Sequence, residues 1–163
     1  MTKSTTGLPD GKAKTIKTTF STETAVSIEI EASPEVVWAL LTNASDYVRW
    51  NSTLMAIEGA IREGESIKLE PTVNPGKTFK IKIAEVVPGT SMQWVSGTAP
   101  FFRGVRLFSL QTTGNGKTRF SMSEKIKGLM YPIAAGQLPD FTAPFEQFAA
   151  DLKSEAEIIR KLK

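Results

Sequence analysis

Residues 26–43 read VSIEIEASPEVVWALLTN, and this stretch decides the fold because its hydrophobic period changes abruptly. Apolar and polar residues alternate from Val26 to Ile30, which predicts a strand with one buried face. Ser33 then offers an N-cap oxygen, and Pro34 suits the first helical position, where a backbone N–H would have no partner. We therefore predict a strand followed at once by a short, mostly buried helix.

The rest of the chain is predicted to form strands and then one long helix. After a second short helix through Tyr47 and Trp50, turn residues such as Pro88-Gly89 and Gly114-Asn115-Gly116 separate strand-like segments. These segments are 55–61, 66–70, 78–86, 91–96, 104–112 and 118–127. No long helix interrupts them, so neighbouring strands should pair antiparallel.

The last segment differs from the strands in its period. From Phe141 to Ile159, apolar residues recur at spacings of three and four, which predicts an amphipathic helix of about five turns with Thr142 as its cap. The predicted fold class is α+β: a curved antiparallel sheet of six to seven strands, two short helices after the first strand, and a long C-terminal helix.

The 163 residues are 40% hydrophobic and 23% charged, which fits a single domain with a sizeable core. Residues 1–20 are rich in Thr, Lys, Ser and Gly, so we expect a disordered leader over 1–21 and one domain over 22–163. No run approaches the roughly 20 apolar residues that span a bilayer, and no signal peptide is recognisable. We expect a cytoplasmic protein without stable membrane insertion.

Cysteine and histidine are both absent from the sequence. This excludes disulfides, thiolate nucleophiles, Cys/His zinc sites and imidazole catalysis. Only Asp, Glu, Lys, Tyr and Arg could move a proton or stabilise a charge, and none of them titrates near neutrality unless its surroundings shift its pKa. We predict neither a metal nor a cofactor.

The net charge of +3 is confined to the first 20 residues, which hold four lysines and one aspartate. The remaining 143 residues carry 16 basic and 16 acidic side chains, interspersed along the chain. No basic face with interleaved aromatic residues stands out, as a nucleic-acid groove would require. We therefore expect no nucleic-acid partner.

The sequence contains a characteristic set of segments: Ser33–Asn43, Tyr47, Trp50-Asn51, Glu85–Gly89, Met92 and Trp94. Together with the order of elements, these segments resemble the helix-grip superfamily, also called START-like or SRPBCC, over about residues 22–162. This superfamily includes START lipid-transfer domains, ubiquinone-binding proteins and aromatase/cyclase proteins of polyketide synthesis. The resemblance implies a sheet wrapped around the C-terminal helix with a cavity between them, but the members' functions are so diverse that the fold does not select one.

Strand parity predicts an inner face rich in aromatic and methionine side chains, opposite three phenylalanines of the long helix. Apolar stripes most often form a filled core, whereas the resemblance favours a cavity that a planar or acyl ligand could enter. The residues that we expect to bind such a ligand are Tyr47, Phe79, Ile81, Trp94, Phe101, Phe102, Arg106, Phe108, Phe120, Met122, Glu124, Tyr131, Phe141, Phe145 and Phe148.

The main polar candidates in this set are Arg106 and Glu124. Pairing the last two strands across the turn at 114–116 places Arg106 opposite Glu124 on the face that also holds Phe108. If that face is inward, the ion pair could recognise the polar group of a ligand. The alternative is a structural pair at the strand ends, or one turned to solvent by a bulge. Tyr47, with Tyr131, could orient a carbonyl.

Two loops are candidate gates of the cavity: Pro100–Gly104 and Leu129–Ile133. Exposed aromatic and aliphatic residues in loops lower solubility unless they have a role. They could close over a ligand, touch a membrane during loading, or simply plug the rim of the fold.

Three functions compete. A module that binds a hydrophobic small molecule or lipid, and that could also transport it, needs only a cavity, a gate and one or two polar groups, and we favour it over an enzyme. A cyclase or dehydratase would need a base, for which only Glu124, Tyr47 or Tyr131 is available. The third is a co-chaperone-like interaction module, suggested by four lysines on the predicted outer face of the sheet: Lys80, Lys82, Lys125 and Lys127. A solvent-exposed face explains these lysines equally well.

Overall fold

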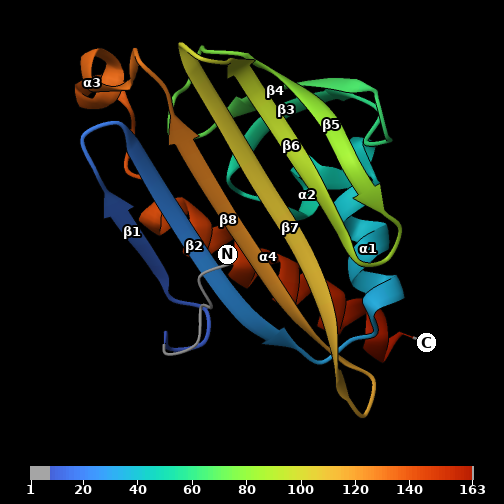
Figure 1. The fold of residues 1–163 in the computed structure, drawn as a ribbon. Helices are drawn as coiled ribbons and strands as arrows, with labels where there is room; N and C mark the ends of the chain where they lie inside the picture. Colours follow the sequence, from blue (N-terminus) through green and yellow to red (C-terminus); the bar gives the residue numbers. More distant parts are fainter. Residues whose placement is uncertain (1–7, 163) are drawn as a thin grey trace.

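The computed structural model describes residues 8–162, in which an eight-stranded antiparallel sheet wraps around one long helix (Figure 1). The strand order is β1-β2-β8-β7-β6-β5-β4-β3, so the leading hairpin pairs with the last strand. The predicted α+β helix-grip architecture is confirmed, with eight strands rather than six or seven. The elements are β1 (Ala13–Lys17), β2 (Ser21–Ile30), α1 (Pro34–Thr42), η1 (Ala44–Asp46), α2 (Tyr47–Trp50), β3 (Leu54–Gly59), β4 (Ser66–Pro71), β5 (Phe79–Val87), β6 (Ser91–Thr98), β7 (Phe102–Gly114), β8 (Lys117–Lys127), α3 (Tyr131–Ala134), η2 (Ala135–Gln137) and α4 (Thr142–Lys161).

The additional strand, β1, lies where the sequence predicted a disordered leader. It pairs antiparallel with β2, from Ala13 opposite Val26 to Lys17 opposite Thr22. Helix α4 also holds it, because the Ala13 N–H donates to Glu146 at 3.1 Å. The leader prediction is therefore wrong for residues 13–21, since hydrogen bonds order this polar edge strand without much apolar burial. Its part over residues 1–7 lies outside the described residues.

The helix starts follow from local chemistry. Ser33 caps α1 as predicted, because its Oγ accepts the Val36 N–H at 3.4 Å. At α4 the predicted cap is wrong: Asp140 Oδ1 accepts the Thr142 N–H at 2.9 Å, and this hydrogen bond lowers the pKa of Asp140. The Thr142 hydroxyl instead hydrogen-bonds the Thr15 hydroxyl of β1 at 2.6 Å, which fixes the start of α4 against the sheet edge.

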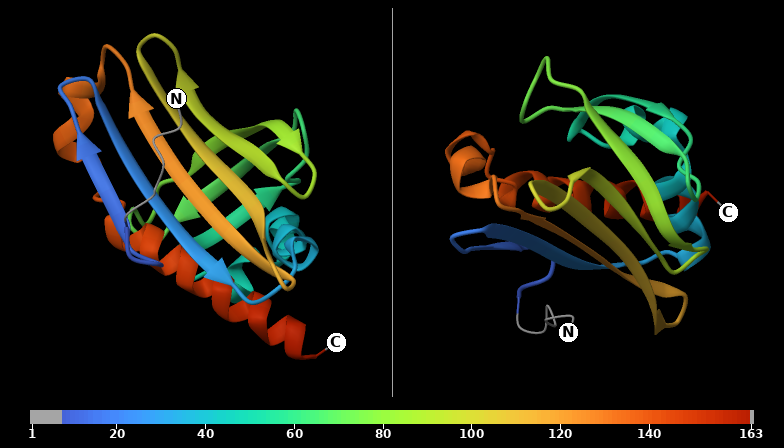
Figure 2. Two further views of the ribbon diagram at one scale, coloured as in Figure 1. Left: turned by 60° about the horizontal axis from the view of Figure 1, so that its bottom comes forward. Right: turned by 45° about the horizontal axis from the view of Figure 1, so that its top comes forward.

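Helix α4 crosses the inner face of the sheet, from the side of β1 to the side of α1 (Figure 2). Its contact with the sheet is centred on Phe148, which is 1% exposed. The Phe148 ring lies 6.0 Å from the ring of Phe108, 6.1 Å from that of Phe120 and 5.9 Å from that of Trp50. Leu152 and Ala156 continue the buried face of the helix toward its C-terminus. Among residues 8–162, no helix is long and apolar enough to cross a membrane.

Phe148→Ala should destabilise the protein by about 3–5 kcal/mol, because it removes a buried ring that contacts both the sheet and α2. Urea denaturation followed by circular dichroism measures this change. Ile158→Ala is the control on the same helix, where the side chain is 51% exposed and the change should stay within about 0.5 kcal/mol. Equal small effects of the two substitutions would contradict the assigned core.

Candidate functional site

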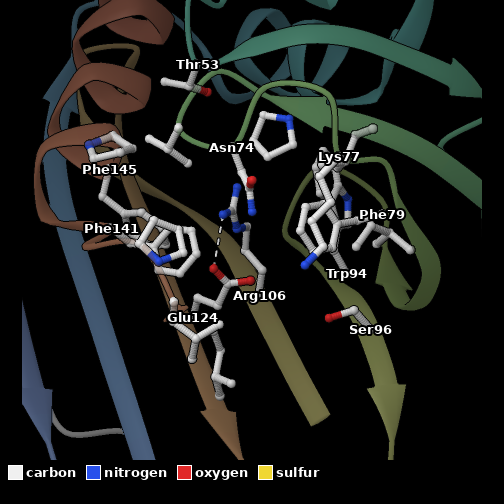
Figure 3. A pocket seen from close by; sticks show the side chains of 18 of the residues that line it. Thr53, Asn74, Lys77, Phe79, Trp94, Ser96, Arg106, Glu124, Phe141 and Phe145 are labelled. Atoms are coloured by element: carbon white, nitrogen blue, oxygen red, sulfur yellow. Dashed lines mark hydrogen bonds and ion pairs between the residues drawn. The ribbon is translucent and has the colours of Figure 1, made fainter. Parts of the chain in front are cut away.

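A cavity of about 400 Å³ lies between the inner face of the sheet and the N-terminal half of α4 (Figure 3). Its wall is formed by side chains of β3 to β8, by the loop between β4 and β5, and by the segment that leads into α4. Ten of the residues predicted to bind a ligand line it: Phe79, Ile81, Trp94, Phe102, Arg106, Met122, Glu124, Phe141, Phe145 and Phe148.

The structure places the other five predicted residues outside this wall. Phe108 and Phe120 are fully buried in the core behind the cavity, where they pack against Phe148. Phe101 is 57% exposed at the tip of the β6–β7 loop. Tyr131 lines a separate cavity of about 280 Å³ between β1, β2 and the segment 135–141. Strand parity identified the inner face but did not show how far the core fills it.

Tyr47, the fifth, does not serve as a polar group of the cavity. Its side chain is fully buried, and its hydroxyl donates to the Leu41 carbonyl at 2.8 Å. Burial raises the pKa of Tyr47 well above its ordinary value, so the hydroxyl stays protonated. The predicted roles of Tyr47 as a carbonyl-orienting group or as a base are therefore wrong, because the donor is already used within the core.

Arg106 and Glu124 face each other across β7 and β8 in the predicted register. Arg106 Nη2 donates to Glu124 Oε2 at 3.1 Å, and the two side chains are 17% and 15% exposed. The guanidinium lies 4.9 Å from the centre of the Phe145 ring, so it touches α4 as well as the sheet. The sequence left open whether this ion pair faces the inside of the fold or the solvent. In the structure both side chains face inward and line the cavity (Figure 3).

Further polar groups of the wall were not identified from the sequence. Asn74 and Lys77 come from the loop between β4 and β5, where no periodicity indicates direction, and Asn74 points toward Arg106 (Figure 3). Ser96 lies two residues after Trp94 on β6, so strand parity could have found it. The indole N–H of Trp94 is buried and, among residues 8–162, has no hydrogen-bond acceptor.

The two predicted gate loops lie together at one end of the cavity. The Leu129 N–H donates to the Pro100 carbonyl at 3.0 Å, and the Met130 N–H donates to the Phe101 carbonyl at 2.8 Å. Phe102 and Met130 line the cavity from these loops. Within residues 8–162, no group of three or more Asp or Glu side chains comes together as metal ligands would.

A family model described as polyketide cyclase / dehydrase and lipid transport matches residues 21–157. The chain belongs to this family. The predicted START-like relationship is thereby confirmed, and the family's description covers both enzymes and carriers. No curated protein matches the sequence.

Solved structures of similar fold have low sequence identity to this chain. The ZhuI aromatase/cyclase of Streptomyces sp. R1128 is 15% identical, with a TM-score of 0.66 over 88% of this chain and 96% of its own. A START superfamily protein of Mycobacterium smegmatis is 15% identical, with a TM-score of 0.64 over 84% and 98%. Norcoclaurine synthase of Thalictrum flavum is 13% identical, with a TM-score of 0.64 over 90% and 98%. Their likeness shows the fold alone.

Tyr47→Phe should change the pH dependence of stability in a defined direction. At neutral pH the variant loses the hydrogen bond to Leu41, which costs about 1 kcal/mol. Above about pH 10, the ordinary pKa of tyrosine, residue 47 ionises in the unfolded chain but not in the folded protein. The unfolding free energy of the wild type therefore falls by up to about 1.4 kcal/mol per pH unit, whereas that of the variant has no such contribution from residue 47.

The difference in unfolding free energy between wild type and Tyr47→Phe should therefore shrink, and then reverse, between about pH 8 and about pH 11. Urea denaturation at both values measures it, and Tyr131 cancels because it is present in both proteins. A difference that stays constant with pH would contradict the buried, protonated state of Tyr47.

Proposed function

We propose that this protein is a carrier that binds a hydrophobic small molecule or lipid between the sheet and α4. The observation on which the proposal rests is the cavity of about 400 Å³, whose wall is mostly apolar and includes Phe79, Trp94 and Phe145. Its volume falls within the range of roughly 300–1,000 Å³ that is typical of small-molecule sites. Water in such a space finds few hydrogen-bond partners, so an apolar ligand would replace it favourably.

The polar groups in the wall suggest what the ligand presents at one end. Among the described residues, the Arg106 guanidinium makes one hydrogen bond, to Glu124, and so keeps further N–H donors. Because this guanidinium lines the cavity and donates, we propose that the ligand carries a carbonyl or carboxylate oxygen that accepts from it.

The charges of the wall favour a carboxylate over a cationic group. The charged side chains that line the cavity are Lys77, Arg106 and Glu124, which sum to a charge of +1. Lys77 Nζ lies 5.6 Å from the centre of the Phe79 ring, at the side of the cavity formed by the β4–β5 loop. An amphiphile with one negative charge would therefore balance the site, with its apolar part against the aromatic wall.

Glu124 also supports a second candidate, a cyclase or dehydratase reaction. It is the one carboxylate among the cavity-lining residues, and a carboxylate can remove a proton next to a carbonyl. Of the three bases that the sequence offered, Tyr47 and Tyr131 do not line this cavity. Because Glu124 is held by Arg106 rather than standing free, we place carriage before catalysis.

Native mass spectrometry of the purified protein, followed by organic extraction, tests the proposal for any ligand that stays bound through purification. We expect the protein to retain, or to take up from a lipid extract, an amphiphile with a carbonyl or carboxylate end. A protein that stays ligand-free and takes up no apolar fluorescent probe would contradict it.

Ser96→Trp should fill the cavity, because Ser96 lines it from the inner face of β6. We expect binding of the probe N-phenyl-1-naphthylamine, followed by fluorescence titration, to weaken by about tenfold or more, equivalent to about 1.4 kcal/mol. Ser66→Trp, at an exposed position of β4, is the matched control and should bind like wild type. Equal affinities of Ser96→Trp and wild type would place the probe elsewhere.

The double variant Arg106→Gln/Glu124→Gln separates head-group recognition from apolar binding, because it removes both charges together. A long-chain carboxylate should bind about tenfold more weakly to it than to wild type, whereas the alcohol of equal chain length should be affected less. Isothermal titration calorimetry measures both ligands. Turnover of a polyketide-like substrate that Glu124→Gln alone abolishes would instead support the enzyme.

A further inference from the structure

Three segments meet at one end of the fold, which we call the open end: the β1–β2 turn at 18–20, the β6–β7 turn at 99–101, and residues 128–133 after β8. The Gly128 N–H donates to the Phe20 carbonyl at 3.3 Å, while residues 129 and 130 donate to the carbonyls of Pro100 and Phe101. A Cβ on Gly128 would lie 2.2 Å from the Phe101 carbonyl oxygen, so the backbones touch here. Figures 1 and 2 show these segments side by side, away from the β7–β8 turn.

The open end exposes large apolar side chains on all three segments. A folded protein gains nothing in water from such exposure, and a contiguous apolar surface commonly marks an interaction site. Because the backbone hydrogen bonds hold the three segments together, these side chains all lie at the same end of the fold. The exposed side chains and their exposed fractions are Phe20 (55%), Phe101 (57%), Leu129 (64%), Met130 (44%) and Ile133 (74%).

Basic side chains outnumber acidic ones around this surface. Residues 17–20, 98–103 and 125–133 contain four basic side chains and no acidic one: Lys17, Arg103, Lys125 and Lys127. Among residues 8–162, none of the four makes an ion pair within 4 Å. The nearest acid in the sheet register is Glu23, opposite Lys125, and Asp140 lies near Lys17.

One cationic pair is unfavourable within the protein itself. Arg103 and Lys127 are both exposed and stand directly opposite each other on β7 and β8. Like charges in this position repel and destabilise a sheet. A partner of negative charge would relieve the repulsion.

We propose that the open end docks on the surface of an anionic lipid bilayer. The five apolar side chains would enter the interface between head groups and acyl chains, and the four basic side chains would contact the anionic head groups. The partner is a membrane rather than an acidic protein because the apolar groups come from three different segments at this end, and a soft surface can take them up without a shaped pocket. With so few apolar groups, binding should be reversible and shallow.

The position of this surface gives docking a consequence for the cavity. Met130 is one of the exposed apolar side chains and also lines the cavity. Phe102, the neighbour of the exposed Phe101, lines the cavity as well. Docking would therefore bring the end of the cavity that Phe102 and Met130 line to the membrane. The inference does not depend on the cavity being a binding site, since it rests on the exposed surface alone.

Co-sedimentation of the purified protein with phosphatidylcholine vesicles, with and without phosphatidylserine, tests the proposal. We expect binding to the phosphatidylserine vesicles, weak binding to phosphatidylcholine alone, and loss of binding as salt rises from about 0.1 M to about 1 M, where the Debye length falls from about 10 Å to about 3 Å. Absence of binding to phosphatidylserine vesicles at low salt would overturn it, even if an acidic protein were captured instead.

Matched variants identify the surface that binds. Ile133→Ser should weaken vesicle binding about tenfold, and Lys127→Glu at least about fivefold. Val87→Ser removes a side chain that is 53% exposed on β5, outside the open end, and should bind like wild type, as should the cavity variant Ser96→Trp. Each variant is first shown by circular dichroism and urea denaturation to fold. Equal losses in Ile133→Ser and Val87→Ser would overturn the assignment to the open end.

Discussion

The contact of Phe148 with the sheet is the constraint on which the rest of the structure depends. This ring joins α4 to Phe108 and Phe120 on one side and to Trp50 on the other, and it fixes how closely the helix approaches the sheet. Toward the C-terminus of α4 the space is filled by Leu152 and Ala156. Toward its N-terminus, hydrogen bonds with Ala13 and Thr15 hold the helix to β1, and the space between Phe145 and the strands β3 to β8 remains open as the cavity. Phe148 is thus both core residue and cavity floor.

Arg106 marks the change from core to cavity. Its guanidinium binds Glu124 on the sheet and lies over Phe145 on the helix, so it bridges the two layers where they separate. A charged side chain in this place must keep hydrogen-bond partners, and the cavity lets it keep contact with solvent or with a polar ligand. The same geometry explains why an apolar molecule with an oxygen acceptor at one end would suit the site.

The sequence predicted those parts of the fold that depend on strong periodicity. Alternation along β7 and β8, joined by a Gly-Asn-Gly turn, fixed the register that brings Arg106 opposite Glu124. β1 was missed because hydrogen bonds to β2 and Glu146, rather than apolar burial, hold it. Asn74 was missed because it lies in a loop. Tyr47 was misassigned because a sequence cannot show that its hydroxyl donates to the Leu41 carbonyl within the core. Periodicity predicts which side chains share one face of the sheet, whereas a cavity depends on how far the helix lies from that face.

The most direct measurement of the central claim is a crystal structure of the protein soaked with a long-chain carboxylic acid that is brominated at its apolar end. The account predicts an anomalous bromine peak inside the cavity among Phe79, Trp94 and Phe145, with the carboxylate next to Arg106. Side chains that close the space between the sheet and α4, with bromine found only on the protein surface, would contradict it.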